Sequence, residues 1–344
     1  MTVLRGRRRV AVRRRRPRAR RDGPEVPRAL GVAGEASGSV CSERLQPFLP
    51  ELVPLLEPHQ DLCIDAATRD RLLHASASTG ERARAPPRTH RVGRRLAQTK
   101  PGTLLRRQIP ALVGSGQAED VPGPLEIDLV SHSGEDAAGT VLSPLSTVDR
   151  ATGGTERMAV RGTGQQGVVA GLDRIRTQLP FRLRGLHPDT GSAFITCHLV
   201  ASCPARGSEF TRSRPSHQND PGHVEQKTWT LVRRLIGDDR LDTPAQRAGL
   251  EAFSTEDLRP FAHGFQPVMT RVGTETVGPR TRRLDDTPTT PRRRLLNGSA
   301  SHVDLNRRRA LTDLDTAASP PTLKRRIDRR LAALPVPLGA HASA

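Results

Sequence analysis

The sequence predicts an α/β fold in which a mixed sheet is flanked by helices. Short apolar runs bounded by turn residues are typical of strands, and they occupy 125–132, 139–149, 155–162, 181–189 and 208–214. Segments with apolar residues at helical spacing follow the third, fourth and fifth runs, at 164–179, 191–203 and 224–237. Strands that are interleaved with crossover helices favour a mixed sheet.

The region before this sheet is expected to be helical. Apolar residues recur near helical spacing over 41–59, and Pro47, Pro50 and Pro54 are expected to break this stretch into short pieces. Asp65 is placed to cap a helix that ends near Ala75, and a second short helix can follow over 78–85. Two short helices joined by a tight turn in a basic chain suggest a helix-turn-helix.

Charge is the strongest compositional signal. The chain of 344 residues carries 55 Lys and Arg against 36 Asp and Glu, a formal net charge of +19, and nearly all of the basic residues are Arg. Arg suits bidentate phosphate contacts, so this excess favours a polyanionic partner such as DNA. The alternative is a GC-rich coding bias, which raises the Arg content whatever the function.

These patterns divide the chain into five parts. They are a disordered basic arm (1–25), a helical, helix-turn-helix-like DNA-binding region (26–85), a basic linker (86–118), the α/β core (119–260) and a basic C-terminal region (261–344). Basic clusters in the last part suggest either a tail that contacts the DNA backbone or a solvated face. No apolar run approaches the roughly 20 residues of a membrane span, so a cytoplasmic protein without a membrane partner is expected.

Three carboxylates are candidates for chemistry. Asp128 lies in the first strand, Asp189 ends the fourth, and Glu225 opens the helix after the fifth. A carboxylate within an apolar strand is costly unless it is compensated, and Mg²⁺ or Mn²⁺ with its preference for hard oxygen ligands would do so. Metal held in this way supports phosphodiester cleavage and transfer. The alternative is three unrelated surface or capping carboxylates.

Several stretches resemble the integrase-core transposases of bacterial insertion sequences. The resemblance runs from about residue 26 to the C-terminus and is carried by EIDLVSH, HPDTGSAFI, FTRSRP, NDPGHVEQKTW, VRRLIG and DTPTTPRRRLL. It implies a ribonuclease-H-like catalytic core over 119–260 that cuts and joins DNA. It also implies transposon ends and target DNA as partners, a homo-oligomer on that DNA, and a nucleoid-associated location in a bacterial cell.

Carried over residue by residue, the resemblance assigns both catalysis and metal binding to Asp128, Asp189 and Glu225, with Mg²⁺ or Mn²⁺ as the cofactor. It places further side chains beside the active site or on DNA, although capping and surface polarity would explain them equally: Arg212, Arg214, Asn219, Asp220, His223 and Lys227.

The chain departs from the family pattern around this triad. Thr190 and Ala193 replace an Asn and a Glu that usually follow the second Asp, and Ser216 and Asp238 replace tyrosines. Gly80 stands where the recognition helix is expected to have an apolar anchor. Two alternatives to an active transposase therefore stay open: a catalytically inactive DNA-binding relic and a largely disordered product of a decayed gene.

Overall fold

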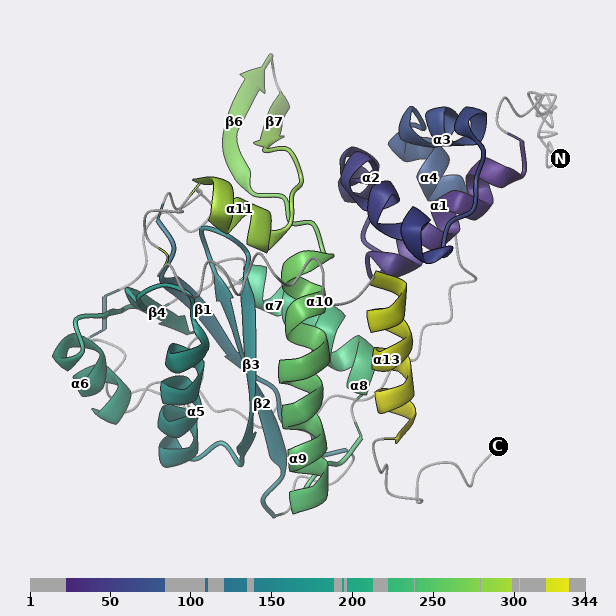
Figure 1. Cartoon of the computed structure of the whole chain (residues 1–344). Helices are drawn as coiled ribbons and strands as arrows, with labels where there is room; N and C mark the ends of the chain where they lie inside the picture. The colour runs from purple at the N-terminus through teal and green to yellow at the C-terminus, as the bar shows by residue number, and fades with distance from the viewer. Residues whose placement is uncertain are drawn as a thin grey trace, which may run out of the picture.

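The computed structural model describes residues 23–83, 109–110, 121–134, 139–188, 194, 197–212, 222–237, 239–278, 280–298, 303 and 320–333. Nearly all of the predicted basic arm and all of the predicted linker except Ile109 and Pro110 lie outside these ranges. Figure 1 shows a sheet flanked by helices, a separate group of helices from the N-terminal part, and a hairpin that projects from the body.

The central sheet has five strands in the order β3-β2-β1-β4-β5. β1 pairs with β2 and β2 with β3 in antiparallel fashion, whereas β1–β4 and β4–β5 are parallel. This mixed arrangement is ribonuclease-H-like, which confirms the predicted fold class. The strands are β1 (Pro124–Leu129), β2 (Leu142–Asp149), β3 (Thr155–Arg161), β4 (Gly185–Pro188) and β5 (Glu209–Phe210).

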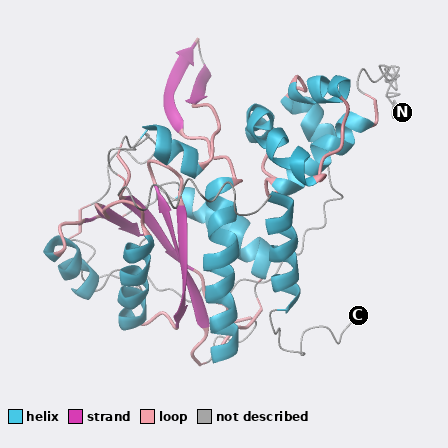
Figure 2. Cartoon of the chain, viewed as in Figure 1, coloured by secondary structure: helices cyan, strands magenta, loops and turns pink. Residues whose placement is uncertain are grey.

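Helices cover both faces of this sheet (Figure 2). α5 (Gln165–Gln178) and α6 (Cys197–Ala205) share an apolar core with one face. The other face is covered by two longer helical segments, each interrupted by a π-helical turn. The first comprises α7 (Gly222–Thr228), η2 (Trp229–Arg233) and α8 (Arg234–Ile236), and the second α9 (Pro244–Ala252), η3 (Phe253–Leu258) and α10 (Arg259–Gly264).

The helical region matches its prediction in outline but not at the prolines. Asp65 caps its helix by accepting a hydrogen bond from the amide of Thr68 at 2.7 Å. The expectation that the prolines break the helix is wrong, since residues 42–56 form one continuous helix. Its prolines lie outside the stripe of buried side chains, whose packing offsets the missing backbone hydrogen bonds. The elements are α1 (Glu25–Ala36), α2 (Ser42–Leu56), η1 (Glu57–His59), α3 (Ala66–Leu73) and α4 (Ala77–Ala83).

Gly80 proves to be a close-approach position. It is buried in α4, and a Cβ built on it would lie 3.0 Å from Oγ of Ser42 and 3.3 Å from its Cβ. The glycine thus lets α4 pack tightly on α2, and a larger anchor would require α2 and α4 to move apart.

The C-terminal region is more ordered than a solvated tail. Phe261 and Phe265 extend the core beyond residue 260, and Leu323 and Ile327 of the final helix join the same cluster. Between them stands the antiparallel hairpin that projects in Figure 1. The elements are β6 (Arg271–Val277), β7 (Arg280–Asp285), α11 (Pro291–Gly298) and α13 (Pro320–Ala333).

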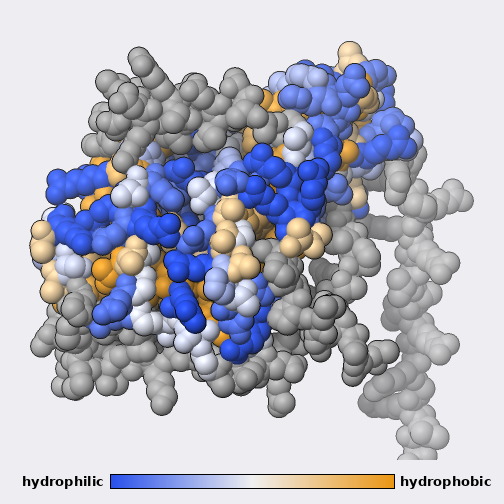
Figure 3. All heavy atoms as spheres, turned by 60° about the horizontal axis from the view of Figure 1, so that its bottom comes forward, coloured by the Kyte–Doolittle hydropathy of each residue, from blue (hydrophilic) through white to orange (hydrophobic). Residues whose placement is uncertain are grey.

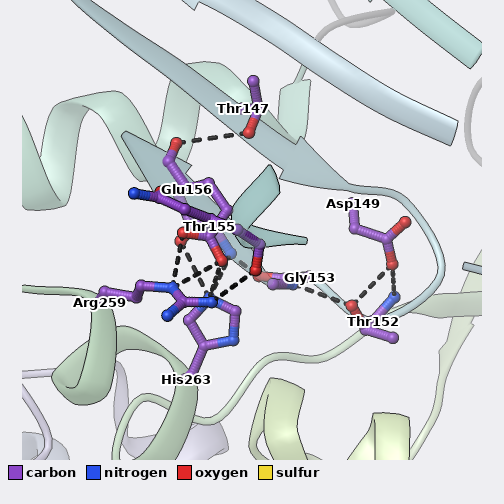
Figure 4. Close-up of polar contacts among 10 residues, drawn as sticks. Thr147, Asp149, Thr152, Gly153, Thr155, Glu156, Arg259 and His263 are labelled. Carbon is purple, nitrogen blue, oxygen red and sulfur yellow. Dashed lines mark hydrogen bonds and ion pairs between the residues drawn. The ribbon is translucent and has the colours of Figure 1, made fainter. Parts of the chain in front are cut away.

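Buried polar contacts hold α10 against the edge strand β3 (Figure 4). Nε of Arg259 donates to both carboxylate oxygens of Glu156, at 2.9 and 2.8 Å, and Nε2 of His263 lies 3.0 Å from the carbonyl oxygen of Thr155. Burial is the main cause that lowers the pKa of His263 to about 3, and Arg259 adds to it. His263 is therefore neutral in the folded protein at ordinary pH.

Candidate functional site

The candidate site begins on β1, the middle strand of the sheet. Side chains alternate between the faces of a strand, and residues paired across strands share a face. Glu126 and Asp128 therefore point to the same side, opposite to Leu125 and Ile127, which join the α5 core. Glu126 is 2% exposed, whereas Asp128 is half-buried. The deeply buried carboxylate of this strand is thus Glu126, which the sequence analysis did not single out.

Helix α7 is fastened to this side of β1 by Glu126. Oε2 of Glu126 accepts hydrogen bonds from the backbone amides of His223 at 3.0 Å and Val224 at 2.9 Å. Nδ1 of the His223 ring lies 3.1 Å from the other oxygen. A carboxylate at a helix N-terminus accepts hydrogen bonds from amides that have no partner within the helix, and its negative charge interacts favourably with the helix dipole. The bonds fix the turn that carries Glu225, which is exposed.

Two further titratable side chains, Arg150 and His187, are associated with the Glu126 carboxylate. Nε of Arg150 lies 3.9 Å from it, and His187 is its register partner on β4. Burial, with a smaller contribution from Arg150, lowers the pKa of His187 to about 4 despite the opposing effect of Glu126. His187 is consequently neutral near pH 7, so the positive charge nearest to Glu126 inside the sheet is that of Arg150.

The second predicted carboxylate, Asp189, comes directly after strand β4. This strand runs parallel to β1, and its last residue, Pro188, pairs with Ile127. Asp189 follows Pro188 directly in the chain but lies outside the described residues, as do Arg214, Asn219 and Asp220. Parallel neighbours end at the same edge of a sheet, and this is the edge toward which Asp128 lies on β1.

Lys227 and Arg212 occupy different environments from those expected of DNA contacts. Lys227 is 7% exposed, and its Nζ lies 3.4 Å from Oε1 of Gln266. Burial, together with Arg44 and Arg157, lowers the pKa of Lys227 to about 7. A buried ammonium facing an amide is a poor phosphate contact, so the predicted surface role of Lys227 does not fit this arrangement.

Arg212 holds the short described segment before the sheet. Its amide donates to the carbonyl of Pro110 at 3.0 Å, and its Nε donates to the carbonyl of Ile109, also at 3.0 Å. Arg212 is half-buried in this position. The side chain therefore has a structural contact, and a contact with DNA stays a prediction.

The donors fit a hard divalent ion by chemistry. Asp128 and Glu225 offer carboxylate oxygens, the ligands that Mg²⁺ and Mn²⁺ prefer. They lie on β1 and on the helix that Glu126 fastens to it. In the part of the chain that the structure describes, no three His, Cys, Asp or Glu side chains form a group that could hold a metal.

Sequence comparison gives one informative relative. No protein-family model matches the chain. It is 36% identical over 262 residues to the uncharacterized protein y4rM of Sinorhizobium fredii, and the alignment covers 75% of each chain. The chain belongs to the same family as y4rM. This membership assigns no activity to either protein.

Comparison with solved structures finds retroviral integrases at low similarity. A chain of the simian T-cell lymphotropic virus intasome in complex with PP2A regulatory subunit B56 gamma aligns over 53% of this chain and 59% of its own length, at 16% identity and a TM-score of 0.32. The HTLV-2 integrase catalytic core domain in complex with magnesium aligns over 34% of this chain and 71% of its own length, at 14% identity and a TM-score of 0.27. The catalytic core domain of BIV integrase aligns over 33% of this chain and 66% of its own length, at 17% identity and a TM-score of 0.26. At these scores the overlaps carry no information about activity.

None of the helices in the described ranges is both long and apolar enough to cross a membrane.

Proposed function

We propose that this chain is a DDE-type polynucleotidyl transferase, a transposase or integrase that cuts DNA strands and joins them to target DNA. One arrangement carries the proposal. Asp128 lies on the central strand, on the sheet face against which Glu126 fastens the helix of Glu225. Asp189 follows β4, the parallel neighbour of β1. In this proposal the three carboxylates hold Mg²⁺ or Mn²⁺.

Each residue then has a separate task. A bound metal would supply activation of the attacking water or 3′-hydroxyl and stabilisation of the leaving oxygen. Asp128 would hold that metal from the sheet and Glu225 from α7, because carboxylate oxygens bind the cation and repel the anionic phosphate. Glu126 does not reach the substrate in this scheme, because Oε2 accepts from the amides of His223 and Val224 and Oε1 lies 3.1 Å from Nδ1 of the His223 ring. We propose that it keeps the two metal-binding carboxylates in register.

DNA is the proposed partner, in the form of transposon ends and target DNA bound by a homo-oligomer. The net charge of +19 supports a polyanionic partner. Hydrophilic residues also cover much of the described surface seen in Figure 3, where apolar residues show between them. Arg212, Arg214, Asn219 and His223 stay proposed contacts beside the scissile strand.

A thermal melt of the full chain with and without Mn²⁺ tests the metal site. Metal that binds only the folded state raises stability by roughly 2.7 kcal/mol at a hundredfold excess over its dissociation constant. Asp128→Asn, Asp189→Asn and Glu225→Gln should each remove most of this shift. Glu209→Gln, an exposed carboxylate on the edge strand β5, is the matched control and should keep it.

A second candidate is a DNA-binding protein that has lost its chemistry. The departures at Thr190, Ala193, Ser216 and Asp238, together with the positive charge, favour it. It predicts DNA binding and a cooperative melt, but no Mn²⁺ shift and no strand cutting. The same melt, followed by incubation with supercoiled plasmid DNA and Mn²⁺, separates the two candidates.

A further inference from the structure

Trp229 is exposed although it lies in a well-packed helical segment. It is the single tryptophan of the chain and exposes 52% of its surface. Leu231 and Val232, two and three positions later, are fully buried. The segment is therefore anchored on its inner side, and about half of the surface of its largest apolar side chain stays accessible to solvent. Burying an indole is strongly favourable, so this outward placement requires an explanation.

The indole lies one helical turn beyond Glu225. Residues four apart lie on the same side of an α-helix, about 6 Å apart along its axis. Glu225, Gln226 and Trp229 are all exposed, whereas the adjacent residues Val224, Lys227 and Thr228 are buried. The outer side of this segment thus presents a carboxylate of the proposed metal site and a large aromatic ring in succession.

A widened turn begins at Trp229. η2 spans Trp229–Arg233, and the hydroxyl of Thr230 donates to the carbonyl oxygens of Gln226 at 3.0 Å and Lys227 at 3.3 Å. Side-chain hydroxyls that bond to the preceding turn compete with regular helix bonds. Single π-helical turns occur frequently at functional sites.

Two basic residues lie near Trp229 along this helical segment. Nη2 of Arg44, from α2 of the helical region, donates to Oε1 of Gln226 at 3.3 Å. Arg233 closes the same π-helical turn that Trp229 opens. An exposed aromatic ring together with nearby cationic groups is the combination by which proteins hold single nucleic-acid strands, because bases stack on the ring while phosphates contact the charges.

We infer that Trp229 is a stacking platform for a nucleobase of the DNA strand that lies at Glu225. The inference rests on the proposed function for the identity of the ligand as DNA, and it adds a base-binding position to a site otherwise defined by phosphate chemistry. Stacking of this kind is tolerant of sequence, since every base has a π-face. Trp229 would thereby hold one nucleotide next to the scissile phosphate in an unstacked state.

The absence of tyrosine in the sequence makes the test direct, because Trp229 dominates the intrinsic fluorescence. The full chain is titrated in EDTA with an oligothymidylate of roughly twenty nucleotides, a length above typical binding sites, and with an abasic oligonucleotide of equal length and charge. We expect strong quenching by oligothymidylate and little by the abasic strand. Anisotropy of labelled strands should show roughly five- to hundredfold tighter binding of oligothymidylate, the range that one stacked base provides.

Variants locate this preference. Trp229→Leu should abolish the preference for bases while keeping the affinity for the abasic strand, and Trp229→Phe should retain part of it. Val272→Ala removes exposed apolar surface (59% exposed) on the distant hairpin and should change nothing. Thermal melts of all three should match wild type, since both positions are exposed.

Three results would overturn the inference. Wild type could bind the two strands equally or bind neither, or Trp229→Leu could keep the full preference for oligothymidylate. In the third, wild type shows no base preference and forms an oligomer that Trp229→Leu dissociates. The last would make Trp229 part of a protein interface. Failure of the proposed chemistry appears elsewhere, as a missing Mn²⁺ shift. Asp128→Asn should keep the base preference in EDTA in either case.

Discussion

The two faces of the central sheet use the same strands in opposite ways. Toward α5, β1 to β3 present mainly apolar residues, among them Leu125, Ile127 and Met158. Toward α7 and α10 they present Glu126, Asp128 and Ser146, with Arg157 paired to Ser146.

This difference separates stability from chemistry. Apolar burial stabilises the fold by roughly 25 cal/mol per Å², whereas each buried polar group costs free energy unless it is paired. The face toward α7 and α10 can also hold apolar side chains, since Val148 and Leu142 lie on it and are buried. Its charged residues are therefore the side chains to examine for function.

The largest expected effect is on activity, through Asp128. Asp128→Asn keeps the shape of the side chain but removes the charge that holds metal. Strand cutting should fall by more than the roughly 10- to 100-fold typical of residues that merely support a ligand, with an unchanged melting temperature in EDTA. Cutting of supercoiled plasmid with Mn²⁺ measures this. Activity equal to wild type would show that the polar face does not carry the chemistry.

The opposite face should respond in stability alone. Ile127 is fully buried between Glu126 and Asp128 but points toward α5. Ile127→Ala removes buried methyl groups and leaves a cavity, which costs about 2–5 kcal/mol. Urea unfolding should record this loss of stability. The rise in melting temperature on addition of Mn²⁺ should stay the same as in wild type. Loss of the metal response without loss of stability would erase the distinction between the faces.

Glu126 should give an intermediate result, because it lies on the polar face but acts through α7. Glu126→Gln can still accept a hydrogen bond but loses the charge beside two amides. We expect strand cutting to fall by roughly 10- to 100-fold, as for other supporting residues, together with a higher Mn²⁺ concentration for half-maximal activity. Glu209→Gln serves again as the control. A loss of activity that no metal concentration recovers would instead place Glu126 among the substrate-contacting groups.

The smallest effect concerns pH and the contacts of α10. The pKa of His263 is about 3 in the folded protein and about 6.5 when exposed. The unfolded chain thus binds more protons between these values, so His263 contributes a loss of stability as pH falls from 6.5 toward 3. Burial raises the pKa of the neighbouring Glu156, which acts with the opposite sign. Arg157, Arg259 and Lys227 also face His263.

His263→Gln isolates the histidine contribution, since Glu156 and the basic neighbours stay in place. Wild type should lose stability relative to His263→Gln as pH falls from 7 to 4, measured by urea unfolding at several pH values. Parallel curves would contradict this, because they would mean that His263 has the same pKa in the folded and the unfolded protein.

Much of the fold was predictable because its signals are local. The strands at 124–129, 142–149 and 155–161 follow their apolar runs, and the Asp65 cap needs only Thr68, three residues away. The candidate carboxylates also come from sequence, although the structure describes only Asp128 and Glu225 of the three.

Other features depended on residues far away in the chain. The continuity of α2 through three prolines follows from its packed face, and the Nζ of the buried Lys227 contacts Oε1 of Gln266, 39 positions later. The hairpin at 271–285 showed no clear periodicity in the sequence, because neither of its faces is covered by a second layer in the described structure.

The sequence by itself determined which segments form strands and helices, the positive charge, and the presence of carboxylates suited to metal. Only the tertiary structure decided which carboxylate is buried and which side chain is left in solvent. Glu126 acquires its role from amides 97 and 98 positions away, and Trp229 is exposed because Leu231 and Val232 take the inner side of the helix. The physical reason is that periodicity is encoded between neighbours, whereas burial and hydrogen-bond partners arise from contacts between distant segments.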